Sequence, residues 1–286
     1  MKLPYYRAIF LHLSIVFAFL FGFTINAQII QIGQDIDGEA AGDYSGIAVS
    51  MNATGDKVAI GAYNNDGNGS NAGHVRIYEW NGTLWTQQGQ DIDGETAGDW
   101  SGWSVSMNAA GDRVAIGAPG NADNGFQSGH VRIYAWNGTS WTQQGQDIDG
   151  EAPWDQSGRS VSMNTTGDRV AIGAYENNDN GWSSGHVRIY NWNGTSWTQV
   201  GQDIDGEAAG DRSGMSVSMN AAGDRVAIGA YGNDGNGSDA GHVRIYEWNG
   251  TSWTQQGQDI DGEAAGDASG NSVSISAAGD RVAIGA

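Results

Sequence analysis

The chain has 286 residues, no cysteine and a formal net charge of −20 at pH 7. A negative charge of this size repels nucleic acid and anionic membrane surfaces, which excludes nucleic acid as a partner, and it attracts cations. The absence of cysteine excludes a disulfide scaffold, so packing or a bound metal ion must hold the fold together. The length is sufficient for a domain with a sizeable core.

Residues 1–27 are predicted to be a secretory signal peptide. Lys2 and Arg7 lead into an apolar run over residues 9–23, and the small residue Ala27 stands at the expected cleavage site. The run is shorter than the roughly 20 residues that a membrane-spanning helix needs. We therefore predict a secreted or cell-surface protein of bacterial type, without a stable membrane span after cleavage.

A unit of 56 residues then repeats without insertion or deletion. A Ser-Gly pair opens each copy, at Ser45, Ser101, Ser157, Ser213 and Ser269. A period this strict predicts a stacked or circular array of one supersecondary unit. The chain divides into an N-terminal outer strand and acidic loop (28–44), four repeats (45–100, 101–156, 157–212, 213–268) and a partial fifth repeat (269–286).

Each unit has the pattern of four strands, because apolar residues alternate in short bursts between turn residues. In the fourth repeat these bursts are SVSMN (216–220), RVAIGA (225–230), HVRIYEW (242–248) and TSWTQQGQDI (251–260). The last two are joined by Asn249-Gly250, a strong hairpin signal. The segment that follows, DGEAAGD, leads to the next unit.

Tryptophans flank each Asn-Gly turn, and we interpret them as cross-strand aromatic pairs in the outer part of the sheet. They are Trp80, Trp136, Trp192 and Trp248 before the turn, and Trp85, Trp141, Trp197 and Trp253 after it. A four-stranded sheet that is apolar on both faces must be covered by copies of itself. We predict an all-β fold, a β-propeller of four-stranded antiparallel blades, rather than a solenoid, whose coils are usually shorter.

The ring of blades is expected to be incomplete. The chain stops two strands into a fifth blade, and residues 28–37 resemble a fourth strand without a third strand to pair with. We expect either a fragment of a longer protein or an open array with exposed edges.

The run SG-x-SVSMN-x-x-GDRVAIGA, followed by a Gly/Asn/Asp loop and GHVRIYEW, resembles the FG-GAP repeat of bacterial exported proteins, which is related to the propeller of integrin α chains. The resemblance implies a propeller with a role in adhesion or ligand binding. Serine replaces the usual Phe of Phe-Gly, and only Gly117-Ala118-Pro119 keeps the Gly-Ala-Pro sequence. The loop between the first two strands has one acidic residue per repeat, so the integrin-type calcium loop is not expected here.

One end of the blades is predicted to be the binding face. Antiparallel strands place the loop after the second strand and the segment before the first strand at the same end, and both are acidic and differ between repeats. Variable loops on a repeated scaffold are common binding sites. The candidate ligand-binding residues are Trp100, Trp103, Phe126, Trp154, Arg159, Trp182 and Arg212.

Calcium is a possible ligand of the recurring DIDGE segments, whose acidic side chains stand at positions i and i+2 as in calcium loops. The candidate ligands are Asp35, Asp37, Asp91, Asp93, Asp147, Asp149, Asp203, Asp205, Asp259 and Asp261. Solvated acidic turns are the alternative interpretation.

We predict a binding or adhesion module for an extracellular protein or glycan, and not an enzyme. The histidines His74, His130, His186 and His242 occupy one position of every repeat, which indicates a structural role, and no catalytic residue is proposed. A carbohydrate-active enzyme, such as a glycosidase or lyase, and a purely structural spacer remain the alternatives.

Overall fold

The computed structural model describes residues 30–286, so the predicted signal peptide lies outside the described residues. Within the described residues the chain forms strands and turns and no helix, which confirms the all-β prediction. Accordingly, this part of the chain has no helix that is long and apolar enough to cross a membrane. All strands belong to one compact unit, Gly33–Ala286.

The strands recur in the same order in every blade. The first blade has β1 (Ala48–Met51), β2 (Lys57–Ala62), β3 (His74–Trp80), β4 (Trp85–Gln87) and β5 (Ile92–Asp93). The second has β6 (Ser104–Met107), β7 (Arg113–Ala118), β8 (His130–Trp136), β9 (Trp141–Gln143) and β10 (Ile148–Asp149). The third has β11 (Ser160–Met163), β12 (Arg169–Ala174), β13 (His186–Trp192), β14 (Trp197–Gln199) and β15 (Ile204–Asp205). The fourth has β16 (Ser216–Met219), β17 (Arg225–Ala230), β18 (His242–Trp248), β19 (Trp253–Gln255) and β20 (Ile260–Asp261), and the fifth has β21 (Ser272–Ile275) and β22 (Val282–Gly285).

The predicted fourth strand is split into two short strands. In the first blade, β1, β2, β3 and β4 pair in that order, all antiparallel, and β5 pairs with β3 as well. The break falls at Gly89, whose φ is +81°. A Cβ at this position would lie 2.7 Å from the ring of Trp136 in the next blade. Glycine therefore interrupts the strand where the neighbouring tryptophan packs against it.

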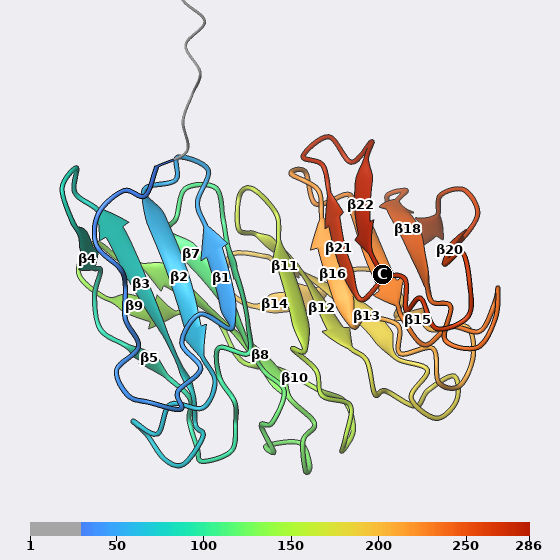
Figure 1. Cartoon of the computed structure of the whole chain (residues 1–286), viewed down its shortest axis with the longest axis horizontal. Helices are drawn as coiled ribbons and strands as arrows, with labels where there is room; N and C mark the ends of the chain where they lie inside the picture. Colours follow the sequence, from blue (N-terminus) through green and yellow to red (C-terminus); the bar gives the residue numbers. More distant parts are fainter. Residues whose placement is uncertain (1–29) are drawn as a thin grey trace, which may run out of the picture. The chain divides into compact units, whose positions relative to one another are not determined.

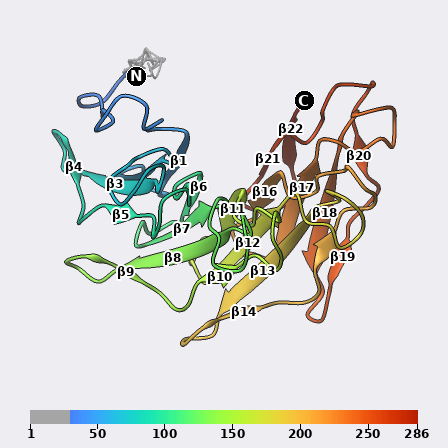
Figure 2. The same ribbon diagram turned by 90° about the horizontal axis from the view of Figure 1, so that it is seen from below.

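Neighbouring blades pack face to face and form one core cluster at each junction. At the first junction, Ala59, Val75 and Ile77 meet Val114, Ile116 and Tyr134 of the second blade, together with Ile92, Met107 and Trp141. Equivalent clusters lie between the second and third blades and between the third and fourth. Figures 1 and 2 show the sheets following one another in chain order.

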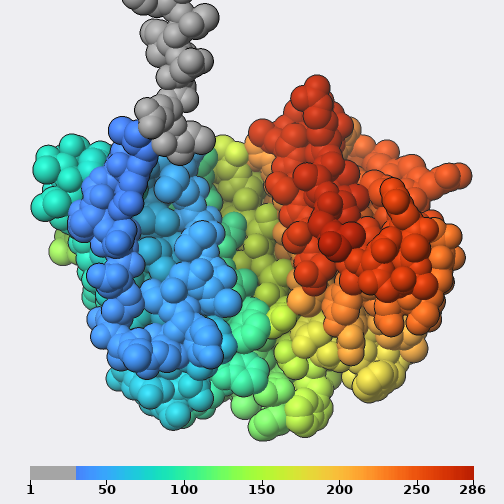
Figure 3. Space-filling view, in the orientation of Figure 1, coloured from blue at the N-terminus to red at the C-terminus, as the bar shows by residue number. Residues whose placement is uncertain are grey.

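The innermost strands β1, β6, β11, β16 and β21 contact one another in sequence and surround a common axis. A pocket at each end of this axis is lined by equivalent residues from all five repeats. The sheets do not close into a ring: the fifth sheet has only two strands. On the first blade Met51 is 54% exposed, whereas its equivalents Met107 and Met163 are 7% exposed. The blue first blade and the red β21–β22 sheet are therefore the two ends of an incomplete propeller (Figure 3).

Each tryptophan pair joins two blades as well as two strands. Trp136 and Trp141 are directly opposed in the ladder, with ring centroids 5.5 Å apart, which confirms the predicted cross-strand pairing. Trp141, Trp197 and Trp253 are buried, and the indole Nε1 of each donates a 2.8 Å hydrogen bond to a carbonyl of the preceding blade. The pair is thus part of the contact between blades.

Glycine in the second strand permits the closest approach between blades. A Cβ at Gly117 would lie 2.1 Å from the backbone carbonyl oxygen of Gly158 in the next blade. Gly61, Gly173 and Gly229 face the equivalent carbonyl at their own junctions. Only a residue without a side chain fits here, which explains why every second strand of a complete blade has glycine at this position.

A buried histidine begins every third strand. His74, His130, His186 and His242 are each 1% exposed. Burial disfavours the charged imidazolium and lowers the pKa of His130 and of His186 to about 4. These imidazoles are therefore neutral at pH 7.

We expect Trp197→Ala to destabilise the protein by about 3–5 kcal/mol, because it removes a buried ring together with its hydrogen bond to Gln144. Chemical denaturation followed by circular dichroism measures the change. Trp182→Ala is the matched control: this side chain is 73% exposed, and its loss should leave the free energy of unfolding unchanged within about 0.5 kcal/mol. Equal losses in the two variants would contradict the role given to the buried ring.

We expect acid to weaken the metal-free protein through these histidines. Between about pH 6.5 and pH 4 the unfolded chain binds a proton at His130 and the folded chain does not, so stability falls as the pH is lowered. The slope per histidine is at most about 1.4 kcal/mol per pH unit. Urea denaturation in EDTA at pH 7.0 and pH 5.5 should show a smaller loss for His130→Gln than for the wild type. An identical loss would show that His130 is not neutral in the folded state.

Candidate functional site

Two loops meet at the predicted binding end of every blade. In the second repeat, the Asn124 side chain donates hydrogen bonds to the carbonyls of Gly150 (2.7 Å) and Glu151 (3.1 Å), which joins the loop after the second strand to the DIDGE segment. Asn68, Asn180 and Asn236 make the same contacts in their repeats. A repeated hydrogen-bond scaffold therefore supports the residues that vary.

A groove of about 430 Å³ lies at this end between the second and third repeats. We call it the outer groove; its lining residues are Trp154, Gln156, Glu176, Asn178, Trp182 and Ser183. Trp154 and Trp182 are 55% and 73% exposed. Phe126 packs against Trp154 with ring centroids 4.6 Å apart. Three predicted ligand-binding residues thus meet in or beside one groove.

Trp154 occupies a backbone position that every other repeat gives to glycine. Its φ is +75°, and its equivalents are Gly42, Gly98, Gly210 and Gly266, all with positive φ. A side chain in this conformation costs roughly 1–2 kcal/mol relative to glycine. The backbone thus keeps the conformation of the glycine repeats although tryptophan stands at this position. The Trp154 side chain is exposed.

Polar groups of the outer groove are held in place by neighbours. Glu176 accepts a hydrogen bond from the Ser183 hydroxyl (2.5 Å) and lies 3.9 Å from Arg212 Nε. The amide oxygen of Gln156 accepts a hydrogen bond from the Tyr175 hydroxyl (3.2 Å). Arg212, another predicted site residue, therefore supports the groove through Glu176 but is not among its lining residues.

Trp103 and Arg159 lie elsewhere, at the mouth of the propeller axis, and Trp100 lies beside Trp103. A pocket of about 360 Å³ lies there, and we call it the axial pocket. Its lining includes the residue that follows each Ser-Gly pair: Ile47, Trp103, Arg159, Met215 and Asn271. The guanidinium of Arg159 lies 4.2 Å over the Trp103 ring, and the Trp100 ring is 6.0 Å from that of Trp103. The predicted residues therefore lie in two places, which Tyr175 connects: the Arg159 guanidinium lies 5.3 Å over the Tyr175 ring, and the Tyr175 hydroxyl donates the hydrogen bond to Gln156 of the outer groove.

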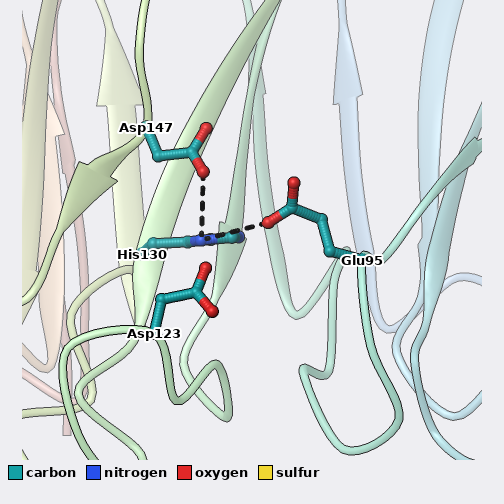
Figure 4. A group of neighbouring side chains, drawn as sticks. All are labelled: Glu95, Asp123, His130 and Asp147. Atoms are coloured by element: carbon teal, nitrogen blue, oxygen red, sulfur yellow. Dashed lines mark ion pairs between the residues drawn. The ribbon is translucent and has the colours of Figure 1, made fainter.

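A histidine and several carboxylates converge in each of the four complete blades. The four groups, which we call the His–carboxylate clusters, are Glu39, His74 and Asp91; Glu95, Asp123, His130 and Asp147; Glu151, Asp179, His186 and Asp203; and Glu207, His242 and Asp259. Their ligand atoms lie within 4.8 Å of one another, so each cluster could hold a metal ion. Figure 4 shows the second cluster, with Glu95, Asp123 and Asp147 turned toward the His130 ring.

Each cluster joins two successive DIDGE segments. In the second cluster, Glu95 ends one segment and Asp147 begins the next, and their oxygens lie 3.9 Å and 4.0 Å from His130 Nδ1. The same sharing recurs in the other clusters. Because the imidazole is neutral, these contacts are not ion pairs at pH 7.

The first aspartate of four predicted calcium segments lies in a cluster, and the second aspartate does not. Asp91, Asp147, Asp203 and Asp259 are cluster members. Asp93, Asp149, Asp205 and Asp261 stand opposite the histidines in the strand ladder, outside the clusters. Burial raises the pKa of Asp93, Asp149 and Asp205. Among the described residues, Asp35 and Asp37 also lie outside the clusters, and the Asp37 carbonyl accepts a hydrogen bond from Arg76.

Sequence reasoning missed the histidines as ligand candidates, along with the DIDGE glutamates and Asp123 and Asp179. The available signal was the strand register. The third strand begins with the histidine and pairs antiparallel with a DIDGE segment, so the histidine lies opposite that segment. The break in exact repetition was a second signal. Aspartate occupies positions 123 and 179, whereas glycine occupies the equivalent positions 67 and 235.

A family model for the FG-GAP repeat matches residues 85–134. This stretch starts at the first residue of β4 and ends inside β8, so it spans the junction of the first and second blades. A search of curated proteins gives no match.

Two solved structures share the fold. A periplasmic gluconolactonase from Pseudomonas aeruginosa has a TM-score of 0.57 and 14% identity, over 83% of this chain and 64% of that protein. A protein described as a candidate 6-phosphogluconolactonase from Bacteroides uniformis has a TM-score of 0.52 and 10% identity, over 75% of this chain and 54% of that protein. The chain thus spans less than two thirds of either structure, and at these identities the likeness concerns the fold alone.

The prediction that the protein is not an enzyme is contradicted by this comparison. Both structures are described as lactonases, so an array of repeated blades is no argument against catalysis. The four clusters are not identical, because the second and third contain a carboxylate that the others lack. The repeat itself is as expected: residues 85–134 match the FG-GAP repeat model, and the sheets form an incomplete propeller.

Proposed function

We propose that the protein is exported and binds a glycan or another polyhydroxylated ligand through the outer groove. Support for export comes from the composition of residues 1–27 and from the FG-GAP repeat, which is typical of extracellular proteins. Support for binding comes from the groove between the second and third repeats.

The observation that carries this proposal is the exposed Trp154 at a glycine position. Trp154 is 55% exposed although its ring packs against Phe126, and its positive φ costs free energy that glycine would not. Natural sequences depart from local preference chiefly at functional sites. Trp182 stands nearby, at a position that is serine in the first and fourth repeats.

The chemistry of the groove suits a sugar ring. Two exposed indoles offer flat apolar surfaces, and the Glu176 carboxylate, the Gln156 and Asn178 amides and the Ser183 hydroxyl offer hydrogen bonds at its walls. Sugars present apolar C–H faces and hydroxyl groups together. The negative charge of the chain disfavours an anionic ligand.

We expect Trp154→Gly to raise the free energy of unfolding by about 1 kcal/mol, because glycine relieves the positive φ. Urea denaturation measures the change. A loss of stability of 2 kcal/mol or more would show that the ring supports the fold, and the argument for a functional tryptophan would fail.

We expect the variant Trp154→Gly/Trp182→Ser to lose at least tenfold in affinity for the sugar that the wild type binds best. The wild-type chain is first screened on a glycan array, and the sugar found is then titrated by calorimetry. Both substitutions introduce residues that this chain uses at the equivalent positions, so the fold should be kept.

Leu84→Ser is the control, because Leu84 is 48% exposed at a hairpin turn, where the other repeats have serine. Unchanged affinity in the groove variant, or an equal loss in the control, would overturn the groove as the binding site. The same proteins are assayed with a sugar lactone, since both solved structures are described as lactonases. Hydrolysis that disappears only in the groove variant would make the groove an active site.

A further inference from the structure

Buried imidazole nitrogens without hydrogen-bond partners occur in three of the four clusters. Among the described residues, Nδ1 of His130 and both ring nitrogens of His186 and of His242 are buried and have no hydrogen-bond partner. The histidines are 1% exposed. A buried polar atom without a partner costs about 1–3 kcal/mol, and in a native protein it calls for an explanation.

The carboxylates around His130 are held with one oxygen turned toward the unpartnered nitrogen. Glu95 Oε1 lies 3.4 Å from Arg132, and Oε2 lies 3.9 Å from His130 Nδ1. Asp147 Oδ1 accepts a hydrogen bond from Gln143 (2.5 Å), and Oδ2 lies 4.0 Å from the same nitrogen. Arginine and glutamine thus orient the carboxylates from outside, as the outer partners of metal ligands do.

The third cluster repeats this arrangement. His186 Nδ1 faces oxygens of Glu151, Asp179 and Asp203 at 3.9, 3.9 and 4.0 Å. Arg188 lies 3.3 Å from the other oxygen of Glu151, and Gln199 donates a hydrogen bond to the other oxygen of Asp203. These spacings are too long for hydrogen bonds to the nitrogen. Three carboxylates so close together repel one another unless a cation lies between them.

We propose that the clusters around His130 and His186 each bind a divalent transition-metal ion of the Zn²⁺ class through one imidazole nitrogen and three carboxylates. Imidazole suits zinc and its neighbours in the first transition row, whereas Ca²⁺ takes six to eight oxygen ligands. The clusters around His74 and His242 have two carboxylates and bind the same ion more weakly. These sites differ from the i, i+2 calcium loops expected from the DIDGE segments.

One loop position separates the two kinds of cluster. Asp123 and Asp179 supply the third carboxylate, and the first and fourth repeats have Gly67 and Gly235 there. In those two repeats an aspartate stands one residue earlier. Asp66 and Asp234 accept a hydrogen bond from a backbone N–H of their own loops (2.8 Å) and lie outside the clusters.

The test titrates EDTA-treated, dialysed full chain with Zn²⁺ by calorimetry and with Co²⁺ by visible absorption. We expect two tight equivalents per chain, with Ca²⁺ at least a hundredfold weaker. Asp123→Gly/Asp179→Gly should weaken both tight sites at least tenfold. It introduces the residue that the chain itself has at Gly67 and Gly235, so its fold should be kept.

Asp66→Asn/Asp234→Asn is the matched control, because it removes the same charge from the equivalent loops, and the two tight equivalents should remain. Gly67→Asp/Gly235→Asp should raise the number of tight equivalents from two to four. A Cβ at either glycine meets the end of an asparagine side chain at 2.8 Å and an aspartate oxygen at 3.8 Å (Asp93) or 3.6 Å (Asp261), and no backbone atom.

Three results would overturn the proposal. The first is a number of tightly bound Zn²⁺ ions per chain that Asp123→Gly/Asp179→Gly leaves unchanged. The second is an equal loss of Zn²⁺ affinity in the control variant, and the third is Ca²⁺ binding as tight as that of Zn²⁺. Circular dichroism of each variant separates loss of a ligand from loss of the fold.

Discussion

The structure depends on the face-to-face packing of neighbouring blades. No blade has a core of its own: each core cluster takes residues from two successive repeats, and the innermost contact is close enough that only glycine fits at Gly117 and its equivalents. Hydrogen bonds cross the same junctions, from the buried indoles to the preceding blade and from Arg132 and its equivalents to the preceding DIDGE segment. Stability therefore belongs to pairs of neighbouring units, as in other repeat proteins.

Much of this was predictable from the sequence, because a strict period and period-two alternation constrain a fold strongly. The repeated sheets, the unfinished fifth sheet and the tryptophan pairs followed from residue spacing. The N-terminal outer strand predicted within residues 28–44 was wrong, because no described residue before Ala48 lies in a strand. The split of the fourth strand did not, because Gly89 interrupts it in response to a ring from the next repeat, and contacts between repeats cannot be derived from one unit. The same limit hid the His–carboxylate clusters, which combine the end of one DIDGE segment with the start of the next.

The loop residues illustrate what variation among the repeats can indicate. Variation among repeats identified Phe126, Trp154 and Trp182, and the structure places them together. The same criterion selected Trp103 and Arg159, which contact each other at the propeller axis. Variation alone thus detects departures from the scaffold, and only geometry sorts them into sites. Strict repetition, by contrast, led us to treat the histidines as structural, although buried nitrogens of His130, His186 and His242 have no hydrogen-bond partner and lie in clusters with carboxylates.

The sharing of each DIDGE segment between two clusters has a consequence for how such a protein can change. A segment contributes its aspartate to the cluster of one blade and its glutamate to that of the next, so a duplicated 56-residue unit would add one blade and one complete cluster at once. Recombination between such similar units would then vary the number of clusters without disturbing those already present. A single codon, for aspartate or glycine at the position of Asp123, would set whether the new cluster has three carboxylates or two.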